Sequence, residues 1–111
     1  KGTRSGVAGV SGLWDSNLEG PLTLVQEGST VTGTHNTAEN GEVVGVLSGN
    51  VLDGFWIEDM SAQRCATARN GRFYWGRIQM TFNGDRFDGK WGYCDGDVSG
   101  TFQGSRKSPA E

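Results

Sequence analysis

A five-residue pattern centred on glycine recurs along this chain and limits what it can fold into. The pattern is a hydrophobic residue, any residue, glycine, any residue and a bulky residue. It occurs seven times, at Val10–Trp14, Val31–His35, Val43–Leu47, Leu52–Trp56, Tyr74–Ile78, Phe87–Trp91 and Val98–Phe102. Because side chains alternate between the two faces of a β-strand, each glycine shares a face with the residues two places before and after it. Each copy therefore predicts a strand whose middle lacks a side chain on one face.

Hairpin-turn sequences separate these predicted strands. The dipeptides Asn40-Gly41, Asn70-Gly71 and Asn83-Gly84 are typical of two-residue turns between antiparallel strands. A further strand without the glycine is expected at 21–26, and residues 64–69 form either a ninth strand or a loop. No window of eleven or more residues carries a helical apolar stripe free of glycine. The chain is therefore expected to be all-β, an antiparallel up-and-down meander of eight or nine strands.

One face of the predicted sheet collects the large side chains. These are Trp14, His35, Leu47, Trp56, Tyr74, Ile78, Met80, Phe87, Trp91, Tyr93 and Phe102. Such alternation indicates a sheet with one covered face, and closure into a small barrel would also remove the exposed edges. The barrel interior would hold either aromatic rings seated on the glycines or one small ligand. The alternative architecture is an open row of hairpins like that of MORN repeats.

Length and charge narrow the organisation and the partners. A chain of 111 residues predicts a single domain, here at 10–104, with an N-terminal arm at 1–9 and a flexible tail at 105–111. The net charge of −3 and the lack of a basic run make a nucleic-acid partner unexpected. No apolar run reaches the ~20 residues that span a membrane, so no membrane association is expected.

The two cysteines, Cys65 and Cys94, leave two alternatives open. Regular ladders with turns at Asn70-Gly71 and Asn83-Gly84 would hold the pair about 10 Å apart, beyond the ~7 Å that a disulfide spans between α-carbons. Either residues 59–69 form a loop and the disulfide closes, or the thiols stay separate. A disulfide would favour an extracellular or periplasmic protein.

The segment GVSGLWDSNLEGPLTLVQEGSTVTGTH, at 9–35, resembles the opening of the avidin and streptavidin family, with its G-x-W strand and its T-G-T-Y-like strand. The resemblance implies a calycin-type barrel with an aromatic-walled mouth, for which Trp56 and Trp91 are the candidate walls. Three family residues that bind the ureido group of biotin match Ser16, Gly20 and His35, and none keeps its type. The resemblance therefore implies a related architecture with a ligand other than biotin, or with none.

These observations favour a non-catalytic binding protein that holds a small, partly polar molecule at the barrel mouth, without a cofactor. The candidate ligand-binding residues are Trp14, Ser16, Asn17, His35, Trp56, Glu58, Tyr74, Trp91 and Tyr93. One alternative is a carbohydrate-binding module or lectin that stacks sugars on exposed Trp and Tyr planes. The others are a small barrel enzyme of the isomerase, cyclase or lyase type and a structural adhesion repeat.

No catalytic or metal-binding constellation emerges from the sequence. His35 is the only histidine, Glu58 and Asp59 point to opposite faces of a strand, and no nucleophile stands in a recognisable motif. No catalytic or metal-ligating residue is therefore assigned. If the barrel were an enzyme, Tyr74, Tyr93 and Arg77 would be the first residues to test.

A second apolar stripe lies on the opposite face to the glycines. It consists of Val44, Val46, Phe55, Ile57, Phe73 and Trp75. Because monomers rarely expose so much contiguous apolar surface, the stripe predicts a subunit interface and a homo-oligomer. The alternative is that the N-terminal arm or the tail covers it.

Overall fold

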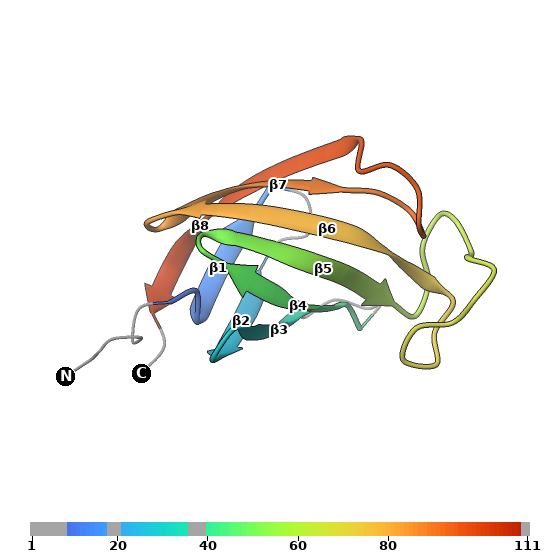
Figure 1. The fold of residues 1–111 in the computed structure, drawn as a ribbon, viewed down its shortest axis with the longest axis horizontal. Helices are drawn as coiled ribbons and strands as arrows, with labels where there is room; N and C mark the ends of the chain where they lie inside the picture. The colour runs from blue at the N-terminus through green and yellow to red at the C-terminus, as the bar shows by residue number, and fades with distance from the viewer. Residues whose placement is uncertain (1–8, 18–20, 36–39, 110–111) are drawn as a thin grey trace.

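The computed structural model describes residues 9–17, 21–35 and 40–109, which form an all-β fold of eight strands (Figure 1). The strands are β1 (Gly12–Ser16), β2 (Leu22–Glu27), β3 (Thr30–His35), β4 (Glu42–Ser48), β5 (Val51–Glu58), β6 (Tyr74–Asn83), β7 (Arg86–Trp91) and β8 (Gly100–Pro109). In this part of the chain, no helix has the length and apolar character needed to cross a membrane.

The strands pair in sequence order, and β8 returns to pair with β1, so the sheet closes into an antiparallel barrel. The predicted meander is confirmed, and the open row of hairpins does not form. Residues 64–69 are not a ninth barrel strand. β8 continues to Pro109 and pairs with β1, which corrects the domain boundary at 104 and the tail expected from 105. Residues 1–8 of the expected arm and residues 110–111 lie outside the described part.

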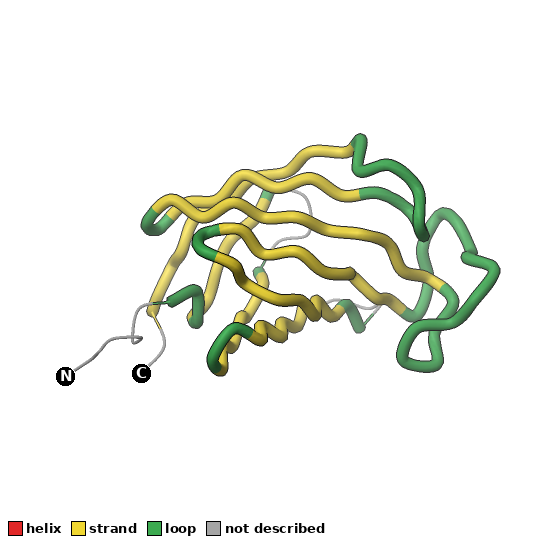
Figure 2. Tube along the Cα trace, in the orientation of Figure 1, coloured by secondary structure: helices red, strands yellow, loops and turns green. Residues whose placement is uncertain are grey.

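The two ends of the barrel differ in their connections (Figure 2). At one end, which we call the hairpin end, two-residue turns join β2 to β3, β4 to β5, and β6 to β7. Each turn begins with a glycine at positive φ: Gly28 at 64°, Gly49 at 62° and Gly84 at 65°. At the opposite end, the open end, the chain makes its longer connections, of which residues 59–73 form the longest.

One predicted turn is displaced by a residue. Asn83-Gly84 was the expected turn, but Asn83 pairs with Arg86 and the turn is Gly84-Asp85. Glycine is favoured at the first central position of a type II′ turn, where φ is positive. Moving the turn by one residue moves the strand pairing by two, so that Ile78 rather than Gly76 lies opposite Trp91. Asn70-Gly71 does form a turn, between Arg69 and Arg72 within the long loop.

Aromatic packing closes the hairpin end of the barrel. Trp14 is fully buried and meets the rings of Phe82 and Phe87 edge-on, at centroid distances of 5.1 and 5.7 Å. Its indole N–H donates to the carbonyl of Val10, and the guanidinium of Arg106 lies 4.7 Å from its ring centroid. These contacts fill the hairpin end of the barrel around Trp14.

Several glycines on the inner face receive an aromatic ring from the residue directly opposite on the neighbouring strand. The pairs are Gly76 with Trp56, Gly89 with Phe102, Gly100 with Trp91, and Gly104 with Phe87. A β-carbon added to any of these glycines would lie within 2.6 Å of the facing ring. Three of these four, Gly76, Gly89 and Gly100, belong to the recurring pattern and make room for aromatic side chains inside the barrel.

Candidate ligand-binding site

A cavity of about 210 Å³ lies at the open end of the barrel. Its described lining residues come from six strands and the two loops at 59–73 and 92–99. They are Leu22, His35, Trp56, Glu58, Ser61, Ile78, Trp91, Tyr93 and Phe102. The cavity is predominantly apolar, with a small number of polar side chains, which is the usual composition of a small-molecule site.

Three aromatic rings form a corner of this cavity. The ring planes of Trp56, Trp91 and Tyr93 are nearly perpendicular to one another, at angles of 76° to 82°. Their centroids are 5.2 to 6.5 Å apart. We call these three residues the aromatic corner. Because each ring packs edge-to-face against the other two, the corner is largely rigid before any ligand arrives.

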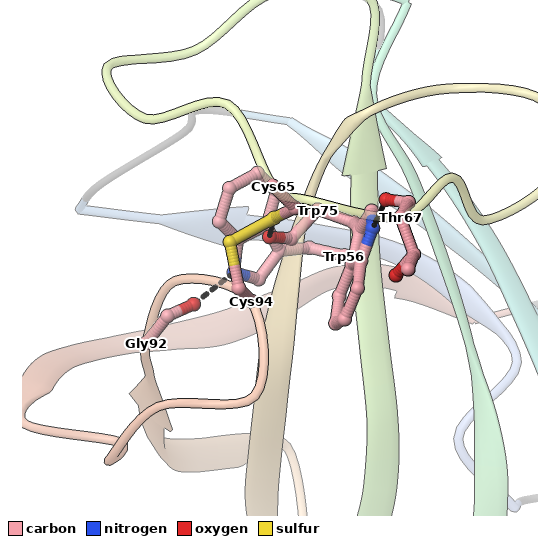
Figure 3. Close-up of a disulfide and its surroundings, with 6 residues drawn as sticks. All are labelled: Trp56, Cys65, Thr67, Trp75, Gly92 and Cys94. Atoms are coloured by element: carbon pink, nitrogen blue, oxygen red, sulfur yellow. Dashed lines mark hydrogen bonds between the residues drawn. A yellow bond between two sulfur atoms is a disulfide. The ribbon is translucent and has the colours of Figure 1, made fainter.

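Backbone contacts position the members of the corner. The indole N–H of Trp56 donates to the carbonyl of Gly92 at 2.9 Å, as the dashed line in Figure 3 shows. This bond ties β5 to the loop that carries Tyr93. Trp91 is the last residue of β7, and its ring rests on Gly100.

The polar side chains of the cavity carry little positive charge. His35 is 8% exposed, and its burial lowers the pKa of the imidazole below the ordinary 6.5, partly offset by a hydrogen bond with the backbone of Pro21. The imidazole is therefore mostly neutral at pH 7. Glu58, at the end of β5, is the one charged residue among the described residues that line the cavity, and neither lysine nor arginine is among them.

The structure brings together five of the nine predicted ligand-binding residues: His35, Trp56, Glu58, Trp91 and Tyr93. The other four do not line the cavity, for different reasons. Trp14 lies in the core of the hairpin end. Asn17 accepts a hydrogen bond from the backbone N–H of Gln103 at 2.9 Å, on the outside of the barrel. Ser16 and Tyr74 are half-buried at the ends of their strands.

Four lining residues were missing from the predicted site: Leu22, Ser61, Ile78 and Phe102. Ile78 and Phe102 were assigned to the inner face but not to its open end. Phe102 lies near the start of β8, at the open end, whereas Ile78 lies in the middle of β6, where its depth follows from the stagger of β6 against β7. Ser61 lies on the long loop, where no strand pattern applies.

A disulfide joins Cys65 to Cys94, with the α-carbons 5.6 Å apart (Figure 3). The two cysteines come closer than regular ladders would allow because neither lies in a regular ladder. The N–H of Cys65 donates to the carbonyl of Phe73, and the N–H of Cys94 donates to that of Trp75. Both segments thus fold back along the start of β6. The disulfide ties the long loop to the loop that carries Tyr93.

The long loop covers part of the outer apolar stripe. Ile57 and Trp75 are at most 2% exposed and pack with Cys65 in a cluster outside the barrel. The indole N–H of Trp75 donates to Thr67, and the guanidinium of Arg69 lies 3.5 Å from the ring centroid of Phe55. Ile57 and Trp75 are therefore not accessible to a second subunit, which corrects their place in the predicted interface. Of the rest, Val46 is 55% exposed, and Val44, Phe55 and Phe73 are half-buried.

Arg72 anchors the same loop to the barrel. It pairs with Glu42 on β4 and with Asp59 at 3.0 Å, and it donates to the carbonyl of Asn40. Hydrogen bonds from Arg72 and Asn40 lower the pKa of Asp59. The guanidinium of Arg72 is thus paired with two carboxylates.

Two other kinds of centre concern the described residues outside the cavity, a metal site and the suspected catalytic site. Within the described ranges, no three His, Cys, Asp or Glu side chains are grouped so that they could hold a metal ion. Arg77, one of the residues suspected in case of catalysis, is exposed on β6 between two inward-facing residues and so points away from the cavity.

Comparison with known proteins adds no relative. The sequence matches no protein-family model, and neither a curated protein nor a solved structure matches it significantly.

Proposed function

We propose that this protein binds a small, partly polar molecule, without covalent chemistry, in the cavity at the open end of its barrel. The observation that carries the proposal is the aromatic corner, which lines an apolar cavity together with a few polar side chains. Ligand sites are typically concave, apolar and largely formed before binding. The volume of about 210 Å³ is below the roughly 300 Å³ at which typical ligand pockets begin. The ligand is therefore a small molecule or the head group of a larger one.

The resemblance of residues 9–35 to the avidin and streptavidin family supports the same proposal at the level of architecture. His35, which matches the Tyr of the family's T-G-T-Y strand, lines the cavity. Ser16 does not line it, and Gly20 lies outside the described residues. Biotin is therefore not the ligand that we propose.

The exposure of the aromatic residues favours the cavity over a sugar-binding surface. All four tryptophans and both tyrosines are in the described part of the chain, and each is buried or half-buried. A lectin-type site needs an exposed ring plane on which a sugar can stack. Carbohydrate binding is therefore the alternative, and the ligand screen described below distinguishes it from binding in the cavity.

The disulfide supports a place of action outside the cytoplasm. Disulfides persist in oxidising compartments and are rare in the cytosol. We propose that the protein works in an extracellular or periplasmic setting, where Cys65–Cys94 keeps the loop beside the cavity in position.

The test is a screen of compact apolar, cationic, anionic and sugar ligands, read by tryptophan fluorescence and melting temperature. A ligand of the cavity should quench fluorescence and raise the melting temperature, because it binds only the folded state. Trp91→Phe should reduce the quench, and this change removes no side-chain hydrogen bond in the described structure. Trp75→Phe, outside the barrel, is the control for the loss of one tryptophan; it also removes the hydrogen bond to Thr67, and it should preserve the quench.

Two results would contradict the proposal. One is a screen in which only sugars bind and Trp91→Phe has no effect, which would favour a lectin surface elsewhere. The other is a screen in which no compound raises the melting temperature.

A further inference from the structure

We infer that the ligand of this cavity is an organic cation, an alkylated ammonium group seated in the aromatic corner and balanced by the carboxylate of Glu58. This inference rests on the proposed function, because it names the class of molecule that the same cavity takes.

The geometry of the aromatic corner suits a cation. A positive charge is attracted to the face of an aromatic ring within about 6 Å of its centroid, most strongly for tryptophan. The three ring planes are nearly perpendicular, and no two centroids are more than 6.5 Å apart. Because all three residues line the cavity, a group seated in the corner lies close to all three rings. Such a set of rings is the arrangement with which proteins recognise quaternary ammonium groups.

The charge of the cavity has the matching sign. Glu58 contributes a carboxylate, and the described lining includes no lysine or arginine. The low pKa of His35 keeps its imidazole mostly neutral, and no other described lining residue can carry a positive charge. Arg72, which anchors the long loop, is already paired with Glu42 and Asp59. Among the described lining residues, an anionic ligand would meet the like charge of Glu58.

The apolar lining favours an alkylated ammonium over a primary one. A primary ammonium has three N–H donors, and burying them without acceptors is costly. In a trimethylammonium group, methyl groups replace these donors, so that burial against Ile78 and Phe102 costs few hydrogen bonds. The cavity has a volume of about 210 Å³. This space suits a molecule of the size of choline.

The decisive experiment compares two probes of equal shape and different charge. Choline and its neutral isostere 3,3-dimethylbutan-1-ol are titrated into the full chain by calorimetry. Choline should bind about tenfold tighter or more, as expected when a desolvated cation meets aromatic faces. Trp91→Leu keeps an apolar side chain but removes a ring, and it should reduce this preference.

A matched pair of variants isolates the carboxylate. Glu58→Gln should weaken choline binding by about tenfold and leave the neutral isostere unaffected, since only the cation interacts with the charge. Asp53→Asn removes the same charge from the outer face of the same strand, where Asp53 is exposed. It should change neither affinity. If both variants weaken choline equally, the effect belongs to the overall charge of the protein and the inference is wrong.

The outcomes separate the inference from the proposed function. If the neutral isostere binds as tightly as choline, the organic-cation inference is overturned and the binding function stands. The same holds if neither probe binds while another compound of the screen does. If no compound binds, both fail. Melting temperatures confirm that each variant is folded, and if Glu58→Gln does not fold, the comparison of the two probes on the unmodified chain still decides.

Discussion

The ring of Phe102 on β8 rests on the backbone of Gly89, directly opposite on β7. A β-carbon at Gly89 would lie 2.3 Å from a ring carbon of Phe102, closer than any real contact. Since the backbone on both sides belongs to a closed barrel, neither strand can move away freely. The space that a side chain at position 89 would need is therefore filled by the ring of Phe102.

Gly89→Ala should destabilise the fold. Overpacking a well-filled core typically costs about 1–3 kcal/mol in the free energy of unfolding. Urea denaturation should show a lower midpoint with an unchanged slope. In the double variant Gly89→Ala with Phe102→Leu, the smaller side chain leaves room for the methyl group. Its loss of stability should therefore be less than the sum of the two single losses. Simple additivity would show that the ring does not oppose the methyl group.

The burial of His35 predicts a loss of stability in mild acid. Its pKa is lowered in the folded state, so between that value and the ordinary 6.5 the unfolded chain binds more protons. The contribution is complete above pH 6.5, is lost as the pH falls toward the folded pKa, and does not change further below it. Melting temperatures from pH 7.5 to 5 should follow this course in the unmodified chain. A His35→Gln variant should have a flatter profile, and equal slopes in the two proteins would contradict the prediction.

Removing the disulfide should affect both stability and the cavity. The cysteines are 29 residues apart, and closing a loop of that size contributes about 2–4 kcal/mol in the chain-entropy model. The double variant Cys65→Ser with Cys94→Ser should lose about this much in chemical denaturation. It should also bind cavity ligands more weakly, because Tyr93 and Ser61 lie on the two segments that the disulfide joins. Unchanged affinity would show that these loops are positioned without it.

Self-association of the chain stays a prediction. The surface available for it is smaller than the predicted stripe, because Ile57 and Trp75 are covered by the long loop. If the outer face of β4 forms an interface, Val46→Lys should shift the protein toward a monomer in size-exclusion chromatography. Val25→Lys provides the control, since Val25 is an exposed valine of similar accessibility on β2, 48% against 55% for Val46. A chain that elutes as a monomer without any substitution would remove the role of Val46.

The alternation of side chains predicted which face of each strand is inside, because that property depends only on a period of two. The alternation did not predict how far along the barrel axis each inward-facing side chain lies, which we call its depth. Trp14 and Trp56 both face inward, yet Trp14 packs at the hairpin end and Trp56 lines the cavity. Depth depends on the stagger of each strand against its neighbours. A single displaced turn, as at Gly84-Asp85, changes that stagger by two residues.

The long loop was the least predictable part of the chain. Its structure depends on contacts between residues far apart in sequence, such as Arg72 with Glu42, rather than on a local period. The same applies to the disulfide, whose formation required that both cysteines leave the ladder. The covering of Ile57 and Trp75 follows from these contacts, and no pattern within β5 or β6 could indicate it.

The pairing of β1 with β8 differs from the other seven pairings, which all join strands adjacent in the chain. A folding chain can build those seven as successive hairpins, each with a small entropy of loop closure. The last pairing must bring together residues such as Ser11 and Arg106, which share a hydrogen bond across almost the whole sequence. Until it forms, the sheet has two free edges, which another copy could pair with. This seam is therefore where we expect amide hydrogens to exchange first and where misassembly between chains would begin.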